Sequence, residues 1–404
     1  MNPWKGLGQL PRPVWIVFAA TLVNRAGTMV LPFLVLYLTR ERGFTASQAG
    51  FVLASYGVGA LIIGPLGGRL CDRIGAIHVL EASLLSSGVV VILLPLARGY
   101  VAIVGIVLLW ALCGEASRPA SLTVVTDLAP PGQRKTAVAL VRLAVNLGMS
   151  IGPAAGGFLS MVSFPTLFVV DGATSIAAGG LLAASRWKKR AGMASAGTAL
   201  TAEQASPTRR NPLADRHLVY FLIAMVPVVM VFFQNQAAMP LHLVHHLHMP
   251  PVAFGLMFTL NTVMVILIEV PLNAATSHWG HRRSLALGAF LVGAGYGGMM
   301  FAGGYVGVAL TVVIWTFGEM IFLPTATTYI AEISPPARRG QYMGLFTMAF
   351  SIAFTIGPML GAAVMERFGP TVLWAAAFGF GCLGAAMMSR VYVKGTALSL
   401  PRDS

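Results

Sequence analysis

The sequence predicts an all-α membrane protein in which twelve transmembrane helices form two pseudo-symmetric six-helix bundles. Hydrophobic residues make up 56% of the 404 residues and charged residues only 10%, which excludes an ordinary soluble domain. Apolar runs recur along the chain, each long enough to cross about 30 Å of hydrocarbon. A shift of 205 positions also carries Trp110 onto Trp315 and Gly152-Pro153 onto Gly357-Pro358. A single offset across separate segments indicates a duplicated unit.

The apolar runs place six spans in each half of the chain. They cover 14–39, 46–70, 77–96, 101–125, 136–161 and 165–186, and then 217–245, 252–275, 284–303, 305–330, 341–364 and 371–392. We therefore predict one bundle in residues 1–186 and another in 217–404. Residues 187–216 are polar, contain Pro207 and Pro212, and are expected to be a linker without a core of its own. The first run is too long for a cleaved signal peptide.

The net charge of +14 indicates orientation in the membrane rather than nucleic-acid binding. Most of the 27 basic residues fall in loops on the side of the chain termini, and only Arg40, Arg42, Arg98 and Arg367 fall on the other side. The positive-inside rule then places both termini and the linker in the cytoplasm, with the basic loops touching anionic lipid. We expect a multi-pass protein of a bacterial cell (inner) membrane.

The loop after the second span reads Gly68-Arg69-Leu70-Cys71-Asp72-Arg73-Ile74-Gly75. Here the chain resembles the major facilitator superfamily, whose signature between spans two and three is Gly-x-Leu-Ala-Asp-Arg-x-Gly-Arg-Lys. Twelve spans, a duplicated half and a cytoplasmic middle loop extend the resemblance over nearly the whole chain. The two basic residues that end the signature are missing, because Ala76 and Ile77 stand there.

The resemblance implies a latch at the cytoplasmic gate. In the family, the signature aspartate faces the start of span eleven and an acid at the end of span four, positions that Asp72, Gly340 and Asp127 occupy here. The positive end of a helix dipole favours such a carboxylate. Arg73 or Arg134 would replace the missing base. The alternative is that Asp72 and Arg73 are an ordinary loop pair.

Span five carries Gly148-x-x-x-Gly152-Pro153-x-x-Gly156-Gly157. This run resembles the antiporter signature of the drug:proton branch of the superfamily, which adds Gly152, Pro153 and Gly156 to the expected gating residues. Small residues at this spacing let helices approach closely, and a proline in an apolar helix permits a bend. Plain helix packing is the alternative, since span eleven repeats the pattern.

Charged residues within the spans are the most direct functional signal, because a charge near the bilayer centre costs several kcal/mol. Arg25 lies in span one, Glu115 and Arg118 lie three residues apart in span four, and Glu319 lies in span ten. A carboxylate that gains and loses an arginine partner can carry a proton. The resemblance points to Arg118 as the span-four arginine tied to proton coupling. For Asp171, Glu269 and Arg142, structural and transport roles both stay open.

Polar and aromatic residues predict the substrate site. We expect Asn24, Arg25, Phe233, Gln234, Asn235 and Asn261 to contact an amphipathic molecule, with interhelical hydrogen bonding as the alternative for each amide. The sequence from His242 to Met249 includes His245, His246 and His248. A solvated outer loop is favoured there over a metal port, because no carboxylate or cysteine lies nearby.

These observations favour a proton-coupled exporter of small amphipathic or lipophilic compounds that works as a monomer by alternating access. The alternative is uptake of an anionic nutrient, peptide or metal complex, with Arg25 and Arg118 as anion clamps. An enzyme is disfavoured because no nucleophile, base and orienting group stand together. We expect no cofactor. Without a phosphate loop, uphill transport must use an ion gradient or a partner chain.

Overall fold

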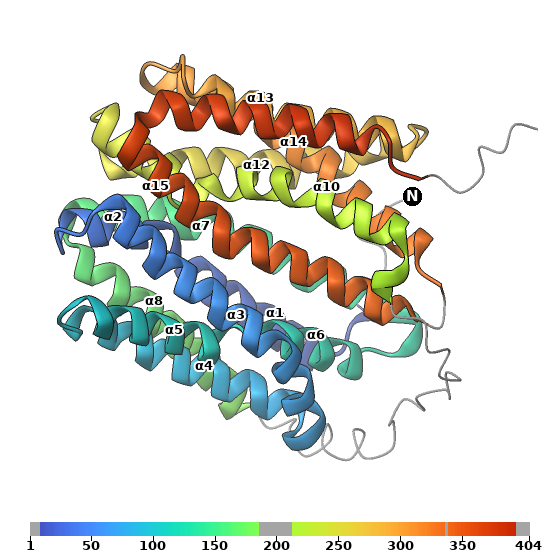
Figure 1. Ribbon diagram of the computed structural model, residues 1–404. Coiled ribbons are helices and arrows are strands. Elements are labelled where there is room, and N and C mark those ends of the chain that lie inside the picture. The colour runs from blue at the N-terminus through green and yellow to red at the C-terminus, as the bar shows by residue number, and fades with distance from the viewer. Residues whose placement is uncertain (1–8, 186–211, 336–337, 393–404) are drawn as a thin grey trace, which may run out of the picture.

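The computed structural model describes residues 9–185, 212–335 and 338–392, and helix is the only regular secondary structure in them (Figure 1). The first half contains α1 (Arg12–Gly27), α2 (Val30–Arg40), α3 (Ala46–Ile74), α4 (Ala76–Leu93), α5 (Tyr100–Gly114), α6 (Ser117–Leu128), α7 (Arg134–Val162) and α8 (Phe164–Ala184). The second half contains α10 (Arg216–Phe232), α11 (Ala238–Leu241), α12 (Pro251–Thr276), α13 (His281–Gly298), α14 (Gly304–Ile333) and α15 (Arg339–Met388).

Eleven spans among the described residues are long and apolar enough to cross a membrane. The predicted span that is not among these eleven is 284–303, which falls on α13. This helix has 18 residues and begins with three basic side chains, His281, Arg282 and Arg283. It packs between α14 and α15 inside the second half. The all-α membrane fold is therefore confirmed. The predicted linker lies outside the described residues up to position 211, so the bundle boundaries at 186 and 217 stay predictions.

Three of the spans are interrupted, and one long helix contains two spans. The first span consists of α1 and α2, which are separated at Thr28 and Met29, and the fourth consists of α5 and α6, which meet at Glu115 and Ala116. In the seventh span α10 ends at Phe232 and α11 begins at Ala238, with a 3-10 turn over Phe233–Gln236 between them. In α15 the backbone turns at Gly369, whose φ of 82° suits glycine. These interruptions free backbone groups in the membrane interior that other residues must satisfy.

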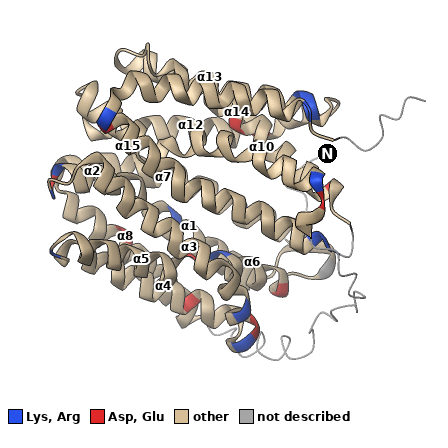
Figure 2. Cartoon of the chain, in the orientation of Figure 1, with Lys and Arg blue, Asp and Glu red and all other residues tan. Residues whose placement is uncertain are grey.

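We name the two ends of the helix bundle by the helices that begin there. The inner face is the end at which α1, α7 and α15 begin, and the outer face is the end at which α3 and α12 begin. Basic residues gather at the inner face, on the right in Figure 2. Contacts between the halves run mainly along two helix pairs, α3 with α15 and α7 with α12.

A hydrophobic core that joins the two halves closes the outer face. It includes Phe33 from α2 and Phe254 from α12, whose ring centroids lie 5.3 Å apart, together with Ala362 from α15. A second buried cluster consists of first-half residues alone and lies toward the inner face, where Leu10, Leu80 and Leu182 contribute. The two halves thus pack against each other through apolar side chains at the outer face, whereas the buried cluster at the inner face belongs to the first half alone.

The glycines of span five pack along the interrupted first span. A Cβ atom added to Gly148 would lie 2.4 Å from Cβ of Arg25, and one added to Gly152 would lie 2.8 Å from the carbonyl oxygen of Thr28. Gly156 similarly faces Met29. The antiporter-like run therefore holds α7 against the break between α1 and α2, which is where Arg25 sits.

This packing predicts that Gly148→Ala destabilises the protein, although alanine is otherwise the better helix former. The added methyl group has no room beside Arg25, and overpacking of this kind costs about 1–3 kcal/mol. We expect a melting temperature several degrees lower in detergent. The matched control is Gly105→Ala in α5, where the added Cβ meets nothing within 4 Å. Equal melting temperatures for the two variants would contradict the packing argument.

Candidate functional site

A cavity of about 1260 Å³ lies between the halves and extends from mid-membrane toward the inner face. Its walls come mainly from spans one, two, four and five of the first half and from α15 of the second, with smaller contributions from α4, α8, Phe233 and Gln236. Most of the wall is apolar. Among the described residues that line it, the charged ones are Arg25, Glu115, Arg118 and Arg142, which leaves an excess of two positive charges when all four are ionised.

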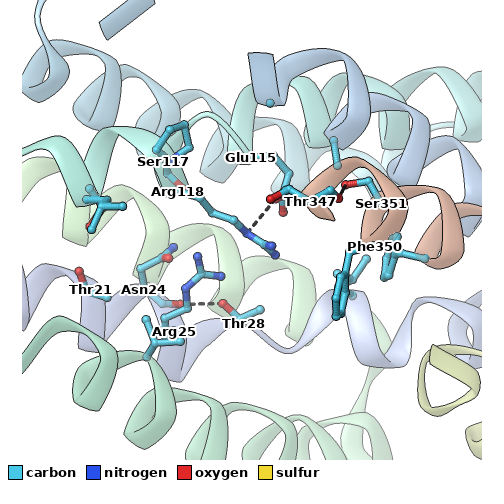
Figure 3. Close-up of a pocket in the computed structure, with 18 of the residues that line it drawn as sticks. Thr21, Asn24, Arg25, Thr28, Glu115, Ser117, Arg118, Thr347, Phe350 and Ser351 are labelled. Atoms are coloured by element: carbon cyan, nitrogen blue, oxygen red, sulfur yellow. Dashed lines mark hydrogen bonds and ion pairs between the residues drawn. The ribbon is translucent and has the colours of Figure 1, made fainter. Parts of the chain in front are cut away.

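Glu115 is held at the break between α5 and α6 by two partners. Arg118 Nε lies 2.8 Å from Glu115 Oε2 (Figure 3). The hydroxyl of Tyr56 donates to Glu115 Oε1 over 2.8 Å. Only 11% of the Glu115 side chain is exposed, whereas Arg118 exposes 63%, and that surface faces the cavity. Both carboxylate oxygens are therefore satisfied, as a buried carboxylate requires.

Arg25 extends into the same part of the cavity as Arg118 (Figure 3). Its Nε atom is buried and has no hydrogen-bond partner among the described residues. Glu115 and Asp171 act on it by longer-range attraction, while Arg118 repels it. Among the described residues neither Arg25 nor Arg142 has an ion pair within 4 Å, and of the two Arg25 lies beside the Glu115–Arg118 pair.

Asp171 stabilises the break that positions Arg25. Its Oδ2 atom accepts the backbone N–H groups of Met29 over 3.1 Å and Val30 over 3.0 Å, at the start of α2. One turn further along α8, Ser175 Oγ accepts from Asn24 Nδ2 over 3.0 Å. Of the two roles left open for Asp171, the observed contacts are structural ones: it caps a helix that has no cap of its own.

The predicted amides occupy two different environments. Asn24 lines the cavity, and so does Phe233, but Gln234, Asn235 and Asn261 are buried away from it. Gln234 Nε2 donates to the carbonyl of Gly357 over 2.8 Å, and Asn261 Nδ2 donates to Glu319 Oε2 over 2.7 Å. Glu319 therefore belongs to a polar cluster between α12 and α14 that also includes Thr316. The structure does not bring this cluster to the cavity wall.

Four of the predicted gating residues lie at the inner face, and three lie deeper in α7. Asp72, Arg73, Asp127 and Arg134 are exposed, and the described residues offer none of them a hydrogen bond or an ion pair within 4 Å. Gly152, Pro153 and Gly156 lie in α7 beside the first-span break and α12, where the backbone of Pro153 faces Gly255. In this conformation the side chain of Asp72 makes none of the contacts expected of a latch at the inner face.

The histidine cluster differs in part from the solvated loop expected there. His242 is buried against Trp374, with ring centroids 5.5 Å apart, whereas His245, His246 and His248 are exposed. The helical conformation continues through His246, so His242 is buried in the protein interior rather than solvated in a loop. Within the described ranges, no three His, Cys, Asp or Glu side chains are grouped so as to hold a metal ion.

Several cavity residues escaped the sequence-based prediction. Tyr56 bonds Glu115, and Trp110, Phe350 and Phe354 add aromatic surface. Tyr56 packs edge-on against Trp110, with centroids 4.9 Å apart. The available signal was a tyrosine between Ser55 and Gly57 at mid-depth in an apolar span, the same kind of signal that selected Asn24.

The fold and the charged cavity between two six-helix halves define a secondary transporter. A family model of the Major Facilitator Superfamily matches residues 16–236 and 220–401. The chain belongs to this superfamily, and it is a membrane transporter rather than an enzyme.

Relatives in bacteria and a solved structure agree with this assignment. The uncharacterised MFS-type transporter YqjV of Bacillus subtilis is 24% identical over 97% of this chain and 96% of its own length. A Na⁺, Li⁺, K⁺/H⁺ antiporter of Planococcus maritimus is 23% identical (89% and 88%), and the multidrug resistance protein MdtH of Aeromonas salmonicida is 22% identical (84% and 83%). A crystal structure of a peptide transporter POT variant superposes with a TM-score of 0.76 at 18% identity, covering 94% of this chain and 95% of that one.

Removal of the Asp171 carboxylate should destabilise the first-span break. Asp171→Ala leaves the N–H groups of Met29 and Val30 without an acceptor, at a cost of about 1–3 kcal/mol for a buried group. We expect a clear fall in the melting temperature, and a smaller one for Asp171→Asn, whose amide oxygen still accepts. Glu41→Ala removes an exposed outer carboxylate and serves as the control. If Asp171→Ala and Glu41→Ala have the same melting temperature, the capping role of Asp171 is wrong.

Proposed function

We propose that the protein exports small amphipathic or lipophilic compounds in exchange for protons. The observation that carries this proposal is the large, mostly apolar cavity that contains one carboxylate, Glu115, with Arg118 as its ion-pair partner. Such a wall accepts varied apolar bodies, and the aromatic rings add adaptable contact area. The names of two relatives, a cation/proton antiporter and a multidrug resistance protein, point the same way.

Alternating access would proceed by rocking of the halves along the α3–α15 and α7–α12 contacts. The outer core is closed and the cavity reaches toward the inner face, which we assign to the cytoplasm of a bacterial cell from its basic residues. This conformation is the one in which an exporter loads its substrate. Nothing in the cavity requires a second subunit, and we propose a monomer.

Glu115 supplies the coupling in this scheme. In the ion-paired form it holds Arg118 and Tyr56, and a proton on Glu115 would release both. Protonation would also raise the excess positive charge of the cavity from two to three, which disfavours a cationic substrate. A proton and a lipophilic cation therefore exclude each other, and this exclusion is what antiport requires. Glu319, whose Oε2 atom accepts a hydrogen bond from Asn261 Nδ2, is proposed as a second proton carrier.

Glu115→Gln should abolish gradient-driven efflux and keep substrate binding. The amide has the shape of the side chain but cannot exchange a proton, so we expect efflux from proteoliposomes to fall more than tenfold. Thermal-shift binding of dyes, antibiotics, lipids, peptides and sugars identifies the ligand for this assay. Glu332→Gln alters an exposed carboxylate that pairs with His281 and is the control. Full efflux in the Glu115 variant would remove Glu115 from the mechanism.

A second candidate, uptake of an anionic nutrient or peptide, is favoured by the three arginines that line the cavity. An anion would bind better after Glu115 is protonated, so proton and substrate would travel together. The peptide transporter of similar fold is compatible with this reading, although the likeness concerns the fold alone. The two candidates predict opposite directions of substrate transport. A pH gradient that is acidic outside drives the substrate out of the cell in the first and into the cell in the second.

A further inference from the structure

The contacts between α3 and α15 follow one antiparallel register. Gly50 of α3 faces Ala362 of α15, and Gly57 faces Thr355, so seven residues forward on one helix match seven residues back on the other. The approach is close: a Cβ atom added to Gly50 would lie 2.9 Å from Cβ of Ala362, and one added to Gly57 would lie 2.9 Å from Cα of Thr355. Small residues create this contact near the outer face.

Toward the inner face the same two helices diverge. Cβ atoms added to Gly64 and Gly68 of α3, or to Gly344 and Gly340 of α15, would meet nothing within 4 Å. Gly64 and Gly344 line the cavity instead. If the register continues, closure of the inner face brings Gly68 opposite Gly344. The next turn brings Asp72 opposite Gly340, the second residue of α15.

At the outer face a carboxylate already occupies the equivalent position on the opposite helix. Glu366, near the outer end of the first span of α15, accepts the backbone N–H of Ser47 over 2.6 Å. Ser47 is the second residue of α3. Thr45 and Gln48 form a capping box at this helix start, and Glu366 satisfies a further free N–H group from the other half of the protein.

We propose that Glu366 is an outer latch that stabilises the outward-closed conformation. This inference rests on the proposed alternating access. Each of the paired helices carries a carboxylate where it leaves the membrane, aimed at the positive start of its partner: Glu366 of α15 at Ser47, and Asp72 of α3 at Gly340. Rocking of the halves engages one contact as it breaks the other, because both lie on one register. The outer contact is engaged here and the inner one is open.

A cysteine pair at the inner end of the register reports which latch is engaged. Gly68→Cys with Gly344→Cys, in a background where Cys71, Cys113 and Cys382 are serine, should form a disulfide only when the inner face closes. Glu366→Gln weakens the outer latch by removing its charge, and Glu366→Ala removes it entirely. We expect disulfide formation to accelerate about threefold in the first and more in the second, in line with charges at helix ends.

Two comparisons make the test decisive. Asp72→Asn weakens the opposite latch and should slow disulfide formation, whereas Glu41→Gln, which changes an exposed outer carboxylate outside the register, should leave the rate unchanged. Unaltered or slower disulfide formation in both Glu366 variants would overturn the proposal, as would an equal acceleration by Glu41→Gln. The assay needs no substrate and no pH gradient. A failure of proton-driven export therefore shows up separately, in the flux measurement.

Discussion

The cost of placing charge in an apolar interior is the constraint on which the rest of this structure depends. Glu115 meets it with two partners, Arg118 and Tyr56, and Asp171 meets it by accepting two backbone N–H groups at the first-span break. Both carboxylates sit where a span is interrupted or beside such a place. The breaks and the charges satisfy each other, because an interrupted helix exposes N–H groups and a buried carboxylate needs donors. Arg25, between these two carboxylates, is then left facing the cavity.

The two halves contribute different residues to the cavity. Among the described residues, the charged ones that line the cavity all come from the first half, which also holds the glycines of α7 that pack against the first-span break. The second half contributes aromatic and small residues of α15 to the wall, while its own buried acid, Glu319, bonds Asn261 away from the cavity. In the proposed rocking motion along α3–α15, the apolar wall of one half would cover the charges of the other to a different extent.

Hydropathy and the 205-residue offset suffice to predict the fold, because a membrane span can be recognised from the length and apolar composition of a run of residues. The candidate site is predictable only in part. Arg25, Glu115 and Arg118 are found because charge in a span is rare, but a uniformly apolar helix has no periodicity to show which side faces a cavity. Hence Gln234 and Asn235 point into the second half, although Phe233 and Gln236 beside them reach the cavity. The role of Asp171 depends on a break in another helix, and the burial of His242 depends on a helix that continues past the expected loop.

In the proposed mechanism, substrate and proton compete at Glu115. Calorimetry of a lipophilic cation such as ethidium, in buffers of different ionisation enthalpy, counts the protons exchanged on binding and so tests this competition. Wild-type protein should release protons as the cation binds, and Glu115→Gln should bind the cation and release measurably fewer. Proton uptake on binding, or a release that is unchanged in the Glu115 variant, would show that the two do not compete at Glu115.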